Sequence, residues 1–80
     1  MKLPRDLTGE QLIRALRQVG YVETRQTGSH VRLTSELPNQ HHITVPLHDP
    51  LRIGTLAAIL SDIAVAKNIS RDELLAALFK

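Results

Sequence analysis

The sequence contains no cysteine and no tryptophan, and its only aromatic rings of the Phe and Tyr type are Tyr21 and Phe79. Without cysteine there is no disulfide framework and no thiolate zinc site, which excludes a disulfide-stapled secreted scaffold and favours a reducing compartment. Modules that read single-stranded RNA by stacking need several exposed rings. Any contact with RNA must therefore rest on charge and shape.

Long apolar runs are also absent. No stretch approaches the roughly 18 uninterrupted apolar residues of a membrane span, and residues 1–6 lack the apolar segment of a signal peptide. We therefore expect a cytoplasmic protein without membrane contact. At 80 residues, we expect one domain over residues 1–80 with an aliphatic core, too small for a nucleotide-binding fold.

Neither sign of charge dominates, since ten Lys and Arg against eight Asp and Glu give a net charge of +2. The cations gather early: six cations and three anions precede residue 35, and four cations and five anions follow. Arginine outnumbers lysine seven to three, and the planar guanidinium suits bidentate contact with phosphate. Ordinary solvated faces explain the charge balance equally well.

Apolar residues recur at helical spacing in three segments, 8–19, 54–67 and 70–79. The first and third segments open with Thr or Ser followed three residues later by Gln or Glu, the spacing of a capping box. Gly20 follows the first segment where a left-handed residue ends a helix, and Asn68 ends the second. We therefore predict three helices.

The period changes to two between the first and second helices, which predicts strands over 21–26, 29–35 and 41–47. A tight antiparallel hairpin is expected across Thr27 and Gly28, because glycine accepts positive φ. The predicted order is α-β-β-β-α-α. We expect an α+β fold in which the helices pack on one face of a three-stranded antiparallel sheet, because each has one apolar side to bury.

Strand alternation predicts which side chains the helices leave uncovered. If the aliphatic residues of the second and third strands face the helices, the opposite face carries His30, Arg32, His42 and Thr44. His48 is expected to continue this set. The other sheet face therefore meets water with histidine and arginine side chains on it.

Alternation does not assign Arg25 to a sheet face, because the adjacent apolar residues Tyr21 and Val22 leave it open which side of the first strand is buried. It also argues against a metal site at His41 and His42, because neighbouring strand residues point to opposite faces. With no thiolate and no clear carboxylate cluster, we expect neither a metal nor another cofactor.

Each candidate residue also has an ordinary structural explanation. His30 follows a Gly-Ser turn, where surface hydrogen bonding is common, and Gly28 is most simply a turn glycine. Ser29 beside His30 lacks the Gly-x-Ser-x-Gly elbow of serine hydrolases. Gly54 is either a helix N-cap or a point of close approach and, preceded by Arg52, could present free helix N–H groups to a phosphate.

Several short segments form a recognisable set in a fixed order. They are Leu12-Ile13-Arg14-Ala15-Leu16 with Gly20-Tyr21, Arg25-Gln26-Thr27-Gly28-Ser29-His30, Thr44-Val45-Pro46-Leu47-His48, and Gly54-Thr55-Leu56 with Ile59-Leu60. Together they resemble the HicA-type mRNA interferase toxins of bacterial type II toxin–antitoxin pairs. The resemblance extends from about Leu7 to Phe79, and Arg-x-x-Gly-Ser-His is its most specific part.

The resemblance implies a fold like the double-stranded-RNA-binding domain, cleavage of mRNA without the ribosome, and silencing by a HicB-type antitoxin. It places the catalytic histidine at His30, the helix-opening Gly-Thr at Gly54 and Thr55, and a Pro-x-His turn at Pro46 and His48. Many relatives carry lysine directly before that glycine, a position that is isoleucine in this chain.

One histidine with several arginines is consistent with metal-independent cleavage of RNA. A base removes the 2′-hydroxyl proton, the oxygen attacks phosphorus, and a 2′,3′-cyclic phosphate forms; imidazole suits the first step and cations stabilise the phosphorane. We hypothesise that His30 is the general base or acid and that Arg25 and Arg32 contact phosphate. Gly28 and Ser29 would set the position of His30.

Further candidates are less specific. His48 and His42 are possible second histidines, and Arg52, Gly54 and Thr55 are possible phosphate contacts. The expected partners are an mRNA substrate and a HicB-type antitoxin that covers the catalytic face. The alternative is a non-catalytic RNA-binding module of the same fold.

Overall fold

The computed structural model describes residues 3–79, which form three helices, a short 3₁₀ turn and three strands. In chain order these are α1 (Gly9–Leu16), η1 (Arg17–Val19), β1 (Val22–Thr27), β2 (His30–Ser35), β3 (His41–Pro46), α2 (Ile53–Lys67) and α3 (Arg71–Leu78). The predicted order α-β-β-β-α-α is confirmed. The strand limits differ from the predicted ones by one residue, and the first helix tightens into a 3₁₀ turn at its end.

Local sequence signals set most helix ends. Gly20 follows η1 with φ of 92°, the left-handed conformation predicted for it. Both predicted capping boxes are present: Thr8 Oγ1 accepts from the Gln11 N–H at 3.0 Å, and Ser70 Oγ accepts from the Glu73 N–H at 3.0 Å.

The start of α2 corrects the interpretation of Gly54. The N-cap is Arg52 and the helix begins at Ile53, so Gly54 is the second helical residue. A Cβ on Gly54 would meet nothing within 4 Å, so close approach does not explain this glycine either. Arg52 has an extended backbone and makes no side-chain capping bond, and the preceding Leu51 is buried with its N–H donating to the Leu7 carbonyl.

The strands form one antiparallel sheet in the order β1-β2-β3. Thr27 pairs with His30, so the hairpin loop is Gly28-Ser29, one residue later than predicted, and Gly28 has φ of 58°. The Leu47 N–H donates to the Ser29 carbonyl at 2.7 Å. The Gly28-Ser29 loop before His30 is therefore held by the pairing of Thr27 with His30 and by the hydrogen bond from Leu47.

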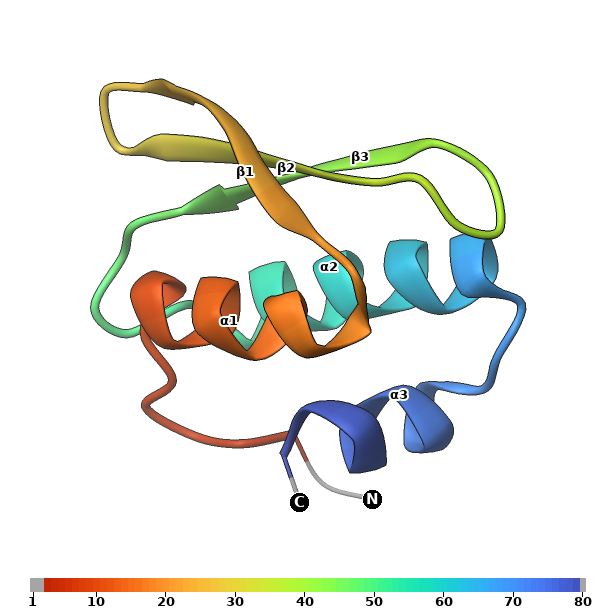
Figure 1. Cartoon of the computed structure of the whole chain (residues 1–80). Helices are drawn as coiled ribbons and strands as arrows, with labels where there is room; N and C mark the ends of the chain where they lie inside the picture. The colour runs from red at the N-terminus through yellow and green to blue at the C-terminus, as the bar shows by residue number, and fades with distance from the viewer. Residues whose placement is uncertain (1–2, 80) are drawn as a thin grey trace.

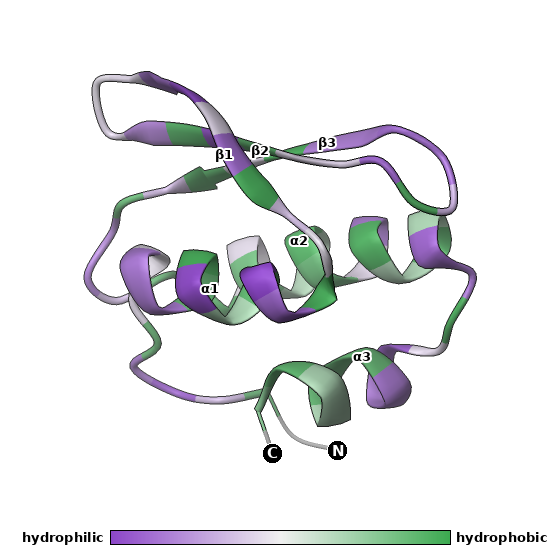
Figure 2. Ribbon diagram, viewed as in Figure 1, coloured by the Kyte–Doolittle hydropathy of each residue, from purple (hydrophilic) through white to green (hydrophobic). Residues whose placement is uncertain are grey.

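All three helices lie on one side of the sheet, as predicted, but in two layers (Figure 1). Helices α1 and α2 lie directly under the sheet, and α3 lies beneath them. Apolar and polar residues alternate along most of β2 and β3 (Figure 2), and their apolar side chains are buried against the helices, whereas β1 is exposed along its whole length. The fully buried side chains include Leu12, Leu16, Tyr21, Leu33, Val45, Leu56, Leu60, Ile63, Leu74 and Leu75.

One glycine is required by packing between elements. A Cβ on Gly9 would lie 2.1 Å from the Pro46 carbonyl oxygen, and the Gly9 N–H donates to the His48 carbonyl at 2.9 Å. Only a residue without a side chain lets the start of α1 pack this closely on the end of β3.

No single helix within residues 3–79 is long and apolar enough to cross a membrane. Helices α2 and α3 reach the required length and composition only when taken together, and they are bent by 104° relative to each other.

Candidate functional site

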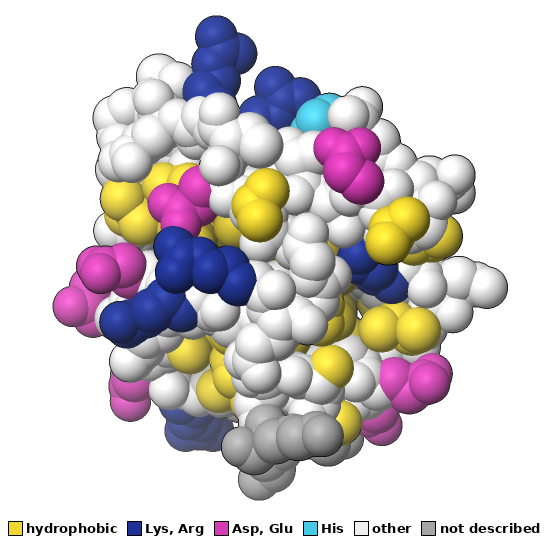
Figure 3. All heavy atoms as spheres, in the orientation of Figure 1, with side chains coloured by type: hydrophobic (Ala, Val, Ile, Leu, Met, Phe, Trp, Pro, Cys, Tyr) yellow, Lys and Arg dark blue, Asp and Glu magenta, His cyan; other side chains and the backbone are white. Residues whose placement is uncertain are grey.

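The free face of the sheet carries a shallow pocket around His30, which we call the His30 pocket. Its volume is about 180 Å³, and its lining residues are Arg25, Thr27, His30, Arg32 and Thr44. They come from all three strands, because Thr27 pairs with His30, Arg25 with Arg32, and Arg32 with Thr44. Figure 3 shows arginine or lysine side chains beside a histidine over the sheet, at the top of the molecule.

A β-bulge brings Arg25 to this pocket. Glu23 pairs with Leu33 and Arg25 pairs with Arg32, so Thr24 is an extra residue without its own partner in β2. A bulge shifts the alternation of a strand by one residue. Simple alternation along β1 therefore gives no consistent phase, whereas the register assigns Arg25 to the same face as Arg32.

The His30 pocket has the chemistry of an anion site. It offers one imidazole, two guanidinium groups and two hydroxyls, and none of the described residues that line it is acidic. Guanidinium forks bind phosphate bidentately. His30 itself is exposed and lies between its cross-strand partners Thr27 and Pro46.

A second pocket of about 330 Å³ lies next to the first, and we call it the His42 pocket. Its polar contacts are ordered: Thr34 Oγ1 lies 2.8 Å from His42 Nδ1 and 3.0 Å from Thr24 Oγ1, and Gln40 Nε2 donates to both Glu36 carboxylate oxygens at 3.4 Å. Arg25 and Arg32 line both pockets. The full lining is Thr24, Arg25, Arg32, Thr34, Glu36, Gln40 and His42.

The family model for the HicA toxin of bacterial toxin–antitoxin systems matches residues 9–65, more than half of the chain. The chain belongs to this family. Membership implies an antitoxin partner, and the matched range contains every residue that lines the two pockets. No curated protein and no solved structure gives a significant match.

The histidines of this HicA-family chain lie at different positions along the sheet. His30 pairs with Pro46 and His42 pairs with Thr34, so four residues separate His42 from the level of His30, which is roughly 13 Å along a strand. His48 lies beyond the end of β3, two residues after Pro46, and does not line the His30 pocket. His30 and His42 therefore lie in two separate pockets, each of which is also lined by Arg25 and Arg32.

The candidates at the start of α2 are not brought to these pockets. Arg52 and Gly54 are exposed and Thr55 is half-buried, and none of them lines the His30 or the His42 pocket. The preceding Leu51 is tied to Leu7, which places this helix end in the helical layer under the sheet (Figure 1).

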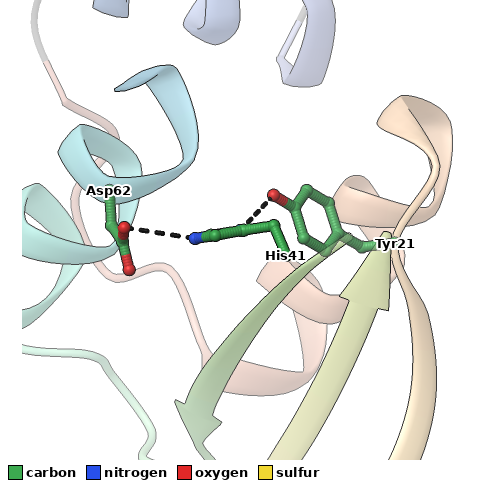
Figure 4. A network of polar contacts seen from close by, with 3 residues as sticks. All are labelled: Tyr21, His41 and Asp62. Carbon is green, nitrogen blue, oxygen red and sulfur yellow. Dashed lines mark hydrogen bonds and ion pairs between the residues drawn. The ribbon is translucent and has the colours of Figure 1, made fainter. Parts of the chain in front are cut away.

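His41 and His42 point to opposite faces, as the alternation predicts. On the helix side, His41 Nδ1 lies 2.7 Å from the Tyr21 hydroxyl and its Nε2 lies 3.2 Å from Asp62 Oδ1 of α2 (Figure 4). Burial and then the nearby Asp62 carboxylate raise the pKa of Tyr21 to about 12, so its hydroxyl stays protonated. In the neutral ring, Nε2–H donates to Asp62 and Nδ1 accepts from Tyr21. This network connects the sheet to α2.

Sequence reasoning missed three residues of the His42 pocket: Thr24, Glu36 and Gln40. Thr24 is the extra residue of the bulge, so alternation along β1 does not indicate its face. Glu36 and Gln40 border the loop between β2 and β3, where no periodicity indicates direction. Within residues 3–79, no group of three or more His, Cys, Asp or Glu side chains could hold a metal ion.

Proposed function

We propose that this toxin is a metal-independent endoribonuclease that cleaves mRNA, with His30 as its general base or acid. The observation that carries the proposal is the pocket that His30 shares with Arg25 and Arg32, on the sheet face that the helices leave free. A proton acceptor starts RNA self-cleavage, and nearby cations stabilise the charge that develops on phosphorus-bound oxygens.

In the proposed reaction the imidazole of His30 removes the proton of a ribose 2′-hydroxyl. The 2′ oxygen forms a bond to the adjacent phosphorus, the bond from phosphorus to the 5′ oxygen breaks, and the departing 5′ oxygen is protonated. The products are a 2′,3′-cyclic phosphate and a 5′-hydroxyl. Arg25 and Arg32 stabilise the negative charge that develops on the phosphorane oxygens.

A second histidine that protonates the 5′ oxygen must reach the same phosphate, within about 3 Å of the proton acceptor. The roughly 13 Å between the levels of His30 and His42 is too long for this role. His48, two residues beyond the partner of His30, is the better placed candidate for the acid.

The proposed antitoxin is of the HicB type and covers the free sheet face. Covering this face blocks the His30 pocket and places acidic partner groups near Arg25 and Arg32. Binding to the helical side alone would leave the pocket open to RNA.

The test is a cleavage assay with toxin refolded free of antitoxin, using single-stranded RNA in excess EDTA. Wild type should release fragments that end in cyclic phosphate, and His30→Ala should be slower by about 10²–10⁴-fold, the usual contribution of a general base. His30→Ala should retain RNA binding, because both arginines remain.

Other outcomes decide between the alternatives. Binding of RNA by both proteins without cleavage by either would support the non-catalytic RNA-binding module. Equal cleavage by wild type and His30→Ala would exclude His30 as the catalytic residue. A slow His48→Ala variant with unchanged RNA affinity would support His48 as the acid.

A further inference from the structure

We propose that the His42 pocket is a base-binding subsite that prefers nucleotides whose base carries an exocyclic amino group. The inference rests on the proposed function in one respect, that RNA lies across the free face of the sheet. It assigns to this face a recognition element separate from the residues that cleave.

The two pockets share Arg25 and Arg32 but differ in whether an acidic side chain lines them. The described lining of the His30 pocket has cations and no acid, whereas the His42 pocket contains the Glu36 carboxylate. A carboxylate repels phosphate but accepts hydrogen bonds from an amino group, as acidic side chains do from N4 of cytosine. The His30 pocket therefore suits the backbone of RNA, and the His42 pocket suits the edge of a base.

Several polar groups of the His42 pocket are hydrogen-bonded to one another without a ligand. Thr34 is buried, and its hydroxyl bonds both His42 Nδ1 and the Thr24 hydroxyl. This fixes the imidazole plane and leaves Nε2 as its other polar atom. The Gln40 amide contacts both oxygens of Glu36. Fixed donors and acceptors are what base-edge recognition requires.

The position of the pocket also fits a base next to the bound phosphate. Arg25 and Arg32 line both pockets, so a strand of RNA can follow the guanidinium groups from one pocket to the other. Proteins that read single-stranded RNA splay its bases away from the backbone and bond their edges. The His42 pocket, at about 330 Å³ against about 180 Å³, is the larger of the two.

Cytidine and uridine provide the sharpest comparison. Their bases have the same size, but cytosine has an N4 amino donor where uracil has an O4 acceptor. The acceptor oxygens of Glu36 favour the first and repel the second. An amide in place of the carboxylate can donate to O4, so Glu36→Gln should remove or reverse the preference.

The experiment measures binding of 2′-O-methyl oligocytidine and oligouridine of equal length by fluorescence anisotropy, because the blocked 2′ oxygen prevents cleavage. Wild type should bind oligocytidine about tenfold more tightly, the effect of one or two well-placed hydrogen bonds. Glu36→Gln should bind both alike or prefer oligouridine. Gln40→Ala, a second variant of the same pocket, should lessen the preference.

Glu10→Gln is the matched control, since it removes the same charge from an exposed position on α1 that lines neither pocket. It should keep the full cytidine preference. Equal affinity of wild type for both oligonucleotides, or a preference that survives Glu36→Gln, would overturn the subsite while His30-dependent cleavage could still be found. A preference that depends on Glu36, in a wild type that never cleaves RNA, would support the subsite and overturn the ribonuclease.

Discussion

Arg32 is one of the two arginines that line both pockets of the free face. It is half-buried in the central strand, whereas Arg25 is exposed on the edge strand β1. A packed stem holds the guanidinium in place and reduces the entropy lost when phosphate binds. Arg32 should therefore contribute more to RNA binding than a freely moving surface arginine does.

The corresponding prediction concerns the salt dependence of RNA binding. Each neutralised phosphate of a single strand contributes about 0.7 to the slope of log affinity against log salt. Arg32→Ala should weaken binding and reduce this slope by about that amount. Anisotropy titrations with single-stranded RNA between 50 and 200 mM salt measure both quantities.

Arg14→Ala provides the comparison, because Arg14 is exposed on α1 and lines neither the His30 nor the His42 pocket. Its slope should equal that of wild type. If both variants lose the same slope, RNA does not follow the free face of the sheet.

The sequence predicted the sheet face of some site residues but not of others, and the difference has a physical cause. His30, Arg32, His42 and Thr44 follow strict alternation in β2 and β3, so the pattern placed them on the correct face. Arg25 follows a bulge, whose extra residue depends on pairing with another strand. Pairing partners are not visible in a local pattern, so its face required the structure.

Among the elements, α3 shows how a local cap responds to pH. The Ser70 N–H donates to the Glu73 carboxylate at 2.9 Å, and the hydrogen bonds with the backbone and side chain of Ser70 lower the pKa of Glu73. A carboxyl group whose pKa is lower in the folded state stabilises the fold above its unfolded pKa, about 4.3. This stabilisation is lost as the pH falls through the folded pKa.

Glu73→Gln should therefore make stability less sensitive to acid. The amide can still accept from the N-cap N–H, as Gln11 does at the start of α1, but it does not titrate. Urea unfolding at pH 6, 4 and 3 should show a smaller loss of unfolding free energy in the variant than in wild type. Parallel losses in the two proteins would show that this cap does not contribute to acid sensitivity.

Helix ends illustrate which signals are local. Both capping boxes span four residues, and the sequence predicted both correctly. The start of α2 was predicted one residue late, because its N-cap, Arg52, makes no side-chain capping bond that a sequence pattern could indicate. The contacts of His41 with Tyr21 and Asp62 join residues about 20 positions apart and have no signature in the sequence.

For the whole molecule, the requirement to bury one apolar face of each element predicted that the helices lie together and leave a sheet face free (Figure 1). The second helical layer was not predictable in this way. Helix α3 packs on other helices, and only the three-dimensional position of α1 and α2 decides that.

The contact between α1 and β3 links this packing to the candidate site, and Gly9→Ala tests it. In a helix alanine is favoured over glycine by up to about 1 kcal/mol, so intrinsic propensity alone predicts stabilisation. The new methyl group would meet the Pro46 carbonyl oxygen at 2.1 Å and the Leu47 Cα at 3.0 Å, both backbone atoms that cannot rotate away. Overpacking of this kind costs about 1–3 kcal/mol, so we expect net destabilisation.

Gly54→Ala separates the two effects, because a Cβ there meets nothing within 4 Å and the residue is also near a helix start. It should stabilise the protein by about 0.5–1 kcal/mol. Urea unfolding of both variants gives the comparison, and equal stabilisation would disprove the close contact of α1 with β3.

Displacing Pro46 and Leu47 also moves the cross-strand partner of His30 and the bond to Ser29. Gly9→Ala should therefore slow RNA cleavage even under conditions where the variant is fully folded, whereas Gly54→Ala should leave the rate unchanged.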